Sequence, residues 1–302
     1  MNISNFKMNI KKELWEFNKL LFWVPLIIVA LIVAAPLLQL LIIEEYQMNS
    51  MLEGLTQLQH HILDDEFSRF SFAAMSGLFV PFMIVALLVQ LYYFLVSLFD
   101  ERRDLSIYFW RSMPISDFAT IGYKLFTGML VIPAVFMLAA TAALFIVALF
   151  ALIACLVLST SFDISLWHIW GNVNFFSNLA LTWLSLIPFV LWLFPLFAWL
   201  MLASMFANKA PFLWALLPVV IVILVEAFIV HYFHLDSLFF TSILADYFGI
   251  SDNTLRSSFT HEAAMHLMPI KVLVSKVNVV AIAIGLGFMY LTYWLRVNRA
   301  HD

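Results

Sequence analysis

The segment HEAAMH at residues 261–266 contains the side chains of a zinc protease site, namely two histidines and a glutamate. Zinc metalloproteases use the motif H-E-x-x-H, in which both histidines lie on one face of a helix and bind the metal. Here His261 and His266 are five residues apart, which separates them by about 140° around a helix. The spacing therefore argues against a metalloprotease site.

The other histidines offer a weaker chemical signal. Several stand beside acids, as in HHILDDE at residues 60–66, and such groups could bind a metal, titrate as a pH sensor, or simply hydrate an acidic surface. No spacing typical of metal ligands is found, so we expect no metal site and no catalytic residue. Seven of the eight histidines fall in segments that are assigned below to the outer side of a membrane: His60, His61, His168, His231, His234, His261 and His266.

Two polar residues interrupt long apolar stretches. Glu226, in VVIVILVEAFIVHYF, is the only acid within such a stretch, and an ionisable side chain inside a membrane is a functional candidate by default. Counted from Pro211, however, it lies about 22 Å along a helix, where its carboxylate could reach the outer surface instead. Gln90 is a weaker candidate of the same kind.

The elements that must position these residues are membrane helices. Of the 302 residues, 64% are hydrophobic and 11% are charged, against roughly 45–50% and about 25% in a soluble domain. A bilayer core of about 30 Å needs roughly 20 apolar residues in a helix. Six stretches meet that length: residues 22–43, 72–99, 125–158, 179–203, 212–231 and 277–295. We therefore predict an all-α integral membrane protein with six transmembrane helices.

The charges predict the orientation of these spans. With both termini in the cytoplasm, eleven of the fifteen Lys and Arg residues lie inside and four outside, as the positive-inside rule requires. The first span is of full length and no cleavage site follows it, so it is expected to be a retained anchor. The chain is therefore expected to cross the membrane several times, with both termini on the cytoplasmic side.

Two further segments are expected to lie along the membrane surface. In residues 1–21, apolar residues recur at helical spacing beside Lys7 and Lys11, which is typical of an amphipathic interfacial helix. Residues 232–276 form the largest outer segment, and their apolar piece LDSLFFTSILADYFGI is too short to cross a bilayer. A re-entrant or interfacial helix is the expected structure there.

The cytoplasmic loop between the second and third spans, residues 100–124, has an unusual composition. Its sequence DERRDLSIYFWRSMPISD joins a run of mixed charges to three consecutive aromatic residues. On a helix three such residues fan through about 200°, so lipid headgroups cannot cover all of them. Since aromatic residues and Arg anchor many interfaces, the loop is expected to contact a protein partner, although a helix that touches only lipid is an alternative.

At these residues the chain resembles the permease subunits of ABC-2 type transporters. The stretch LFDERRDLSIYFWRSMPISD, followed by YK, is similar to their loop between spans two and three, and the leader KKELWEFNKLLFWVPL is similar to their entry into the first span. The resemblance implies a single transmembrane domain over residues 1–302 and a coupling helix from Ser106 to Pro114 that docks on a separate ATPase subunit. The residues expected at this contact are Asp100, Arg102, Arg103, Asp104, Ser106, Tyr108, Phe109, Trp110, Arg111, Ser112 and Pro114.

The resemblance also implies the partners and the energy source. Two permease copies, as a homodimer or a heterodimer with a paralogue, would associate with two ATPase subunits and with membrane lipids; no nucleic acid is expected. The sequence contains no G-x-x-x-x-G-K-[ST] phosphate loop. We therefore expect no cofactor in this chain, with ATP and Mg bound by the partner ATPase.

Two classes of function follow from these observations. The favoured one is the permease subunit of an ATP-driven exporter for a hydrophobic or amphipathic substrate such as a lipid, peptide or antibiotic. The alternative is a polytopic membrane enzyme with a His and acid site on the periplasmic side. An enzyme with an outward site has no need of the aromatic cytoplasmic loop, whereas a coupled permease does.

Overall fold

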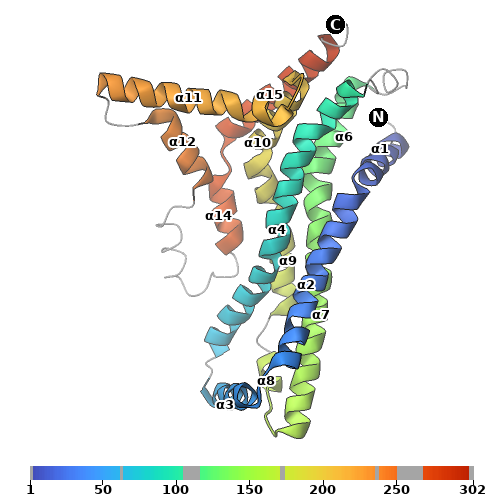
Figure 1. Ribbon diagram of the computed structural model, residues 1–302, viewed down its shortest axis with the longest axis vertical. Helices are drawn as coiled ribbons and strands as arrows, with labels where there is room; N and C mark the ends of the chain where they lie inside the picture. The colour runs from blue at the N-terminus through green and yellow to red at the C-terminus, as the bar shows by residue number, and fades with distance from the viewer. Residues whose placement is uncertain are drawn as a thin grey trace. The chain divides into compact units, whose positions relative to one another are not determined.

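A computed structural model of the chain describes residues 3–61, 64–104, 116–170, 174–234, 238–249 and 268–298. These residues form helices and connecting turns, with no strand among them (Figure 1). The all-α class predicted from the sequence is confirmed.

Within the described residues, six helical segments are long and apolar enough to cross a membrane: Lys19–Gln39, Ser71–Arg103, Asp117–Ser161, Phe175–Phe206, Pro211–Phe233 and Val279–Asn298. They agree in number and order with the six predicted spans. The third is longer than residues 125–158, because α6 (Asp117–Phe126), the π-helix η2 (Thr127–Val131) and α7 (Ile132–Ser161) follow one another without a break. These helices support a multi-pass membrane protein.

The chain divides into two compact units. The first comprises residues 1–13, 88–131 and 184–302, and the second comprises residues 14–87 and 132–183. The helix α4 (Asp64–Arg103) contributes its first part to the second unit and its last part to the first.

In the second unit, α2 (Val24–Ile42) packs against α7. It follows the short π-helix η1 (Lys19–Trp23), and α3 (Glu45–His61) comes after it. The unit also contains α8 (Trp167–Trp170) and α9 (Phe175–Leu184). Trp183 near the end of α9 donates a hydrogen bond to the hydroxyl of Thr141 in α7 at 3.2 Å, which links these two helices.

The first unit is built around α10 (Leu186–Phe206), which is the most buried of the six spans. It packs most closely against α15 (Val279–Asn298). A Cβ atom at Gly285 of α15 would lie 2.7 Å from the ring of Phe194 and 3.2 Å from the backbone of Pro195. The absence of a side chain at Gly285 therefore allows the two helices to approach each other.

The helix α11 (Pro211–Phe233) leaves α10 at a steep angle (Figure 1). Ala210, directly before it, has a left-handed backbone conformation with φ of 49°, and this turns the chain. α12 (Phe239–Phe248) and α14 (Met268–Lys276) follow before α15. Most large apolar side chains of α11 are exposed, as expected for a helix that faces lipid.

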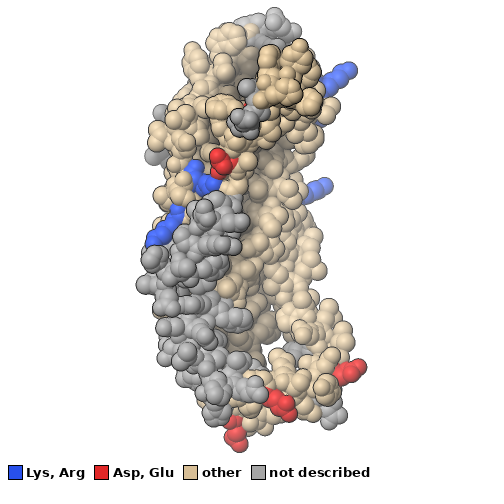
Figure 2. Space-filling model, turned by 90° about the vertical axis from the view of Figure 1, so that its left-hand side faces the viewer, with Lys and Arg blue, Asp and Glu red and all other residues tan. Residues whose placement is uncertain are grey.

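Exposed apolar side chains are found along all six spans. Among the described residues on the face shown in Figure 2, few are charged. A water-soluble protein rarely exposes apolar patches of this extent. Most of the buried polar and charged side chains lie in the first unit.

Candidate functional site

Four helix segments of the first unit meet at the two ends of the segment between residues 104 and 116. α4 ends at Arg103, and α6 begins at Asp117 with Ser116 as its N-cap, whose hydroxyl accepts a hydrogen bond from the backbone N–H of Ala119 at 3.2 Å. The other two segments are the C-terminal part of α15 and the helix α1 (Ile3–Glu16).

Arg296 of α15 joins the two sides of the loop. Its Nη1 lies 3.0 Å from Oε2 of Glu101 in the last turn of α4, and its Nε lies 2.8 Å from Oδ1 of Asp117 in the first turn of α6. The Arg296 side chain is only 1% exposed. One buried guanidinium group therefore fixes both ends of the segment between residues 104 and 116.

Lys124 of α6 extends this arrangement to α1. Its Nζ lies 2.9 Å from Oε1 of Glu13 and 3.1 Å from Oε1 of Glu101, and it donates to the backbone carbonyl of Ser97 at 3.1 Å. Tyr93 donates its hydroxyl hydrogen to Oε2 of Glu13 at 2.8 Å. We call Glu13, Glu101, Asp117, Lys124 and Arg296 the charge network.

Burial of these charges costs desolvation free energy, so the loss of one member is expected to destabilise the protein strongly. Glu13, Glu101, Lys124 and Arg296 are almost completely buried, whereas Asp117 is 22% exposed. Removing one partner of a buried ion pair strands the other charge and typically costs about 3–5 kcal/mol. The network thus holds α1, α4, α6 and α15 in one defined arrangement.

The four described residues of the predicted ATPase contact have different surroundings. Arg102 donates to the backbone carbonyls of Ser204, at 3.3 Å, and Ala207, where α10 ends. A cation at a helix C-terminus satisfies its last carbonyls and interacts well with the helix dipole. Arg103 lies on the surface and pairs with Asp100 at 3.1 Å and Asp104 at 2.9 Å. Arg102 thus anchors α4 to α10, and Arg103 and Asp104 remain accessible.

The remaining residues of that prediction are Ser106, Tyr108, Phe109, Trp110, Arg111, Ser112 and Pro114, and they lie outside the described residues. Their flanks are described on both sides, at Asp104 and Ser116.

Gln90, a candidate from the sequence, satisfies backbone groups of the π-helix η2. Its Nε2 donates to the carbonyl of Gly128 at 2.9 Å and lies 3.5 Å from the carbonyl of Met129. Pro133 follows, and proline has no N–H to offer to the carbonyl four or five residues earlier. Gln90 replaces that donor, which explains why an amide is buried in the middle of an apolar helix.

Glu226, the other candidate, caps the short helix α12. Its carboxylate accepts hydrogen bonds from the backbone N–H groups of Phe240 and Thr241, the latter at 2.9 Å, and from the hydroxyl of Thr241 at 2.8 Å. Unpaired N–H groups and the helix dipole make a helix N-terminus favourable for an anion. Its carboxylate is therefore engaged by α12.

The far end of α12 is held as well. Lys276 of α14 donates to the carbonyl of Asp246 at 2.7 Å and to that of Gly249. Trp192 of α10 donates to the carbonyl of Tyr247 at 3.2 Å, and the hydroxyl of Tyr247 donates to the carbonyl of Trp192. Burial raises the pKa of the Tyr247 hydroxyl, which therefore stays protonated as a donor. Hydrogen bonds thus connect α12 to α10, α11 and α14.

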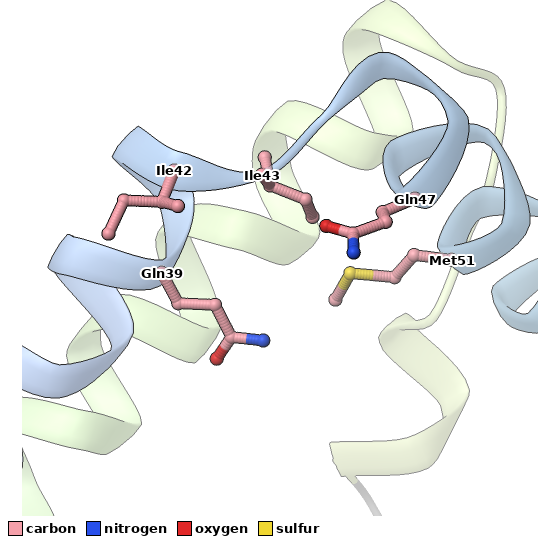
Figure 3. Close-up of a pocket in the computed structure, with 5 residues that line it drawn as sticks. All are labelled: Gln39, Ile42, Ile43, Gln47 and Met51. Carbon is pink, nitrogen blue, oxygen red and sulfur yellow. The ribbon is translucent and has the colours of Figure 1, made fainter.

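An open pocket in the second unit lies between α2 and α3 (Figure 3). The side chains of Gln39, Gln47 and Met51 point toward it, and Ile42 and Ile43 complete its lining. Among the described residues, no group of three His, Cys, Asp or Glu side chains is arranged to hold a metal ion. The pocket offers two amides and a thioether but no charged group.

Sequence reasoning did not identify the charge network as a site. One signal was present, because Gln90, Tyr93, Ser97 and Glu101 recur at spacings of three, four and four residues along α4. This is a polar stripe on one helical face, and it indicates a polar partner inside the protein. The identity of that partner, Lys124, depends on a contact between distant helices.

No family model matches the sequence, and neither a curated protein nor a solved structure shows significant similarity to the chain.

Proposed function

We propose that this chain is the permease subunit of an ABC-2 type transporter in a bacterial inner membrane, with both termini in the cytoplasm. A separate ATPase subunit, which binds ATP and Mg, drives it. Two permease copies and two ATPase copies make the working assembly. The expected activity is export of a hydrophobic or amphipathic substrate such as a lipid, peptide or antibiotic.

The observation that carries this proposal is the double contact of Arg296 with Glu101 and Asp117. These two acids stand on either side of the segment 105–115, which contains the aromatic triplet. A partner that pulls or pushes this segment acts on a rigid base, since its two flanks cannot separate without breaking buried ion pairs.

The charge network and Arg102 would distribute such a movement to other helices. Lys124 connects the base to Glu13 in α1, and Arg102 connects it to the end of α10. α10 in turn packs against α15. A displacement at the loop would thus be transmitted to several membrane helices at once, as ATP-driven transport requires.

The proposal is tested with Phe109→Ala and Trp110→Ala. Loss of an aromatic anchor from an interface costs on the order of 2 kcal/mol or more, so these variants should insert normally but lose the co-purifying ATPase and substrate-stimulated hydrolysis. Tyr46→Ala is the control, because Tyr46 is exposed on α3 and far from the loop in sequence. Full retention of partner and stimulation in both variants would refute the coupling role.

A further inference from the structure

The pocket between α2 and α3 lies where the first span ends. Gln39 is the last residue of that span, and the other lining residues are Ile42, Ile43, Gln47 and Met51. In Figure 1, α3 runs across the direction of α2, and the six described spans do not include it. A partly polar helix in this orientation is typical of a membrane surface. The pocket therefore opens at the boundary between the hydrocarbon core and the lipid headgroups.

The side chain of Gln47 is held in a defined orientation. α3 begins at Glu45, so Glu44 precedes the helix and Gln47 is its third residue. Oε1 of Gln47 accepts a hydrogen bond from the backbone N–H of Glu44 at 3.4 Å, as the third residue of a helix does in a capping box. In the described part of the chain, Nε2 of Gln47 donates to no other residue. Both hydrogens of Nε2 can therefore bind an acceptor in the pocket.

Gln39 supplies a second amide from α2. Its side chain points toward the pocket (Figure 3) and has no hydrogen-bond partner among the described residues. The remaining lining side chains, Ile42, Ile43 and Met51, are apolar. Amide N–H groups donate to carbonyl oxygens, and no lining residue carries a charge to pair with an ion. The pocket is thus suited to a neutral acceptor with an apolar body.

An exposed apolar stripe leads from the pocket along α2. Leu31, Leu38 and Ile42 recur at spacings of seven and four residues, which places them on one helical face, and each is more than half exposed. The stripe is about 16 Å long at a rise of about 1.5 Å per residue. One leaflet contributes about 15 Å to a bilayer core of about 30 Å. The stripe therefore matches the depth that an acyl chain occupies in one leaflet.

We propose that this pocket binds the glycerol ester groups of one diacyl phospholipid. The ester carbonyls accept hydrogen bonds from Nε2 of Gln39 and of Gln47, and an acyl chain lies against the apolar stripe. The pocket volume of about 440 Å³ falls within the roughly 300–1,000 Å³ of ligand pockets. The inference concerns the chain alone and does not depend on the transport proposal.

The charges beside the pocket indicate which headgroup it accepts. Glu44 and Glu45 stand between Ile43 and Gln47 in the chain, and Glu44 is exposed. A carboxylate attracts an ammonium group and repels a further negative charge. Phosphatidylethanolamine, which carries an ammonium group beside its phosphate, is therefore the expected ligand, in preference to the anionic phosphatidylglycerol.

The test uses native mass spectrometry of the full chain after removal of bound lipid. Phosphatidylethanolamine, its ether-linked analogue without ester carbonyls, and phosphatidylglycerol are titrated separately. The wild type should bind one ester-linked phosphatidylethanolamine at least about fivefold more tightly than the ether-linked analogue, as expected for the loss of one or two hydrogen bonds.

Two variants change the pocket in different ways. Gln39→Leu/Gln47→Leu removes both donors and should abolish the preference for the ester. Met51→Trp keeps both amides but fills the cavity, and should weaken binding of the ester-linked lipid at least about fivefold through overlap with the ligand. Asn49→Leu is the matched control, because Asn49 is an exposed amide of α3 about 200° around the helix from Gln47.

Loss of ester-linked binding in both pocket variants, with normal binding in Asn49→Leu, supports the inference. The inference is overturned if the wild type binds the ester and ether lipids equally, or if either pocket variant binds like the wild type. Equal loss in Asn49→Leu, or equal binding of phosphatidylglycerol and phosphatidylethanolamine, overturns it as well. None of these outcomes involves an ATPase, so they are separate from the test of transport.

Discussion

Arg296 and Asp117 are 179 residues apart in the sequence, and their side chains meet at 2.8 Å. The contact joins the last span to the first turn of α6, directly after the loop that carries the aromatic triplet. Because Arg296 also contacts Glu101, a residue of the last helix holds together the two flanks of a loop in the first half of the chain.

Arg296→Met should therefore destabilise the protein strongly. The variant leaves Glu101 and Asp117 without a shared cation, and the expected loss is about 3 kcal/mol in the free energy of unfolding. Denaturant unfolding in detergent measures it. Arg103→Met is the control, because Arg103 is exposed and its pairs with Asp100 and Asp104 lie on the surface. Equal stability of the two variants would show that the network contributes little.

A second prediction concerns the close approach of α4 and η2. A Cβ atom at Gly128 would lie 2.3 Å from the ring of Phe94, which is itself fully buried and stacked on Phe197 at 4.7 Å. Gly128→Ala should cost about 1–3 kcal/mol through overpacking. Gly122→Ala, one to two turns earlier with open space at its Cβ, should instead gain up to about 1 kcal/mol from helix propensity.

The decisive result is which of the two glycine variants is the more stable. Thermal unfolding in the same detergent compares them directly. If Gly128→Ala is as stable as Gly122→Ala, the packing of Phe94 on η2 is not as described.

Gln90→Leu tests the role of the buried amide. It removes the donor for the carbonyls of Gly128 and Met129, and an unsatisfied buried acceptor costs about 1–3 kcal/mol. Pro133→Ala restores a backbone N–H, so the double variant should lose less stability than the sum of the single losses. Strict additivity in this double-mutant cycle would contradict the explanation given for Gln90.

Glu226→Ala tests the attachment of α12. Without the carboxylate, the backbone N–H groups of Phe240 and Thr241 lose their acceptor, so their hydrogen exchange should accelerate. Exchange in α10 should not change, which makes that helix an internal control. Unchanged protection at Phe240 and Thr241 would show that Glu226 does not hold the start of α12.

The sequence predicted the spans well because bilayer thickness sets their length. Apolar residues 212–231, for example, lie within α11, Pro211–Phe233. The third helical segment, Asp117–Ser161, is longer than the predicted span 125–158, since the polar residues Asp117 and Lys124 gave no apolar signal in the sequence. In the structure both pair with charged partners: Asp117 with Arg296, and Lys124 with Glu101 and Glu13.

The site could be predicted only in part. The polar stripe on α4 is a local pattern, but its pairing with Lys124 is not, and neither is the link from Glu101 to Arg296 across 195 residues. Glu226 was correctly singled out as unusual, while its partner was not foreseen. The position of α12 depends on contacts with α10, α11 and α14, which no local pattern records.

The composition of the purified assembly tests the central claim most directly. Native mass spectrometry after mild detergent extraction should detect two copies of this chain with two copies of an ATPase that contains a phosphate loop. The claim is contradicted if the chain is recovered as a stable monomer with no associated ATPase.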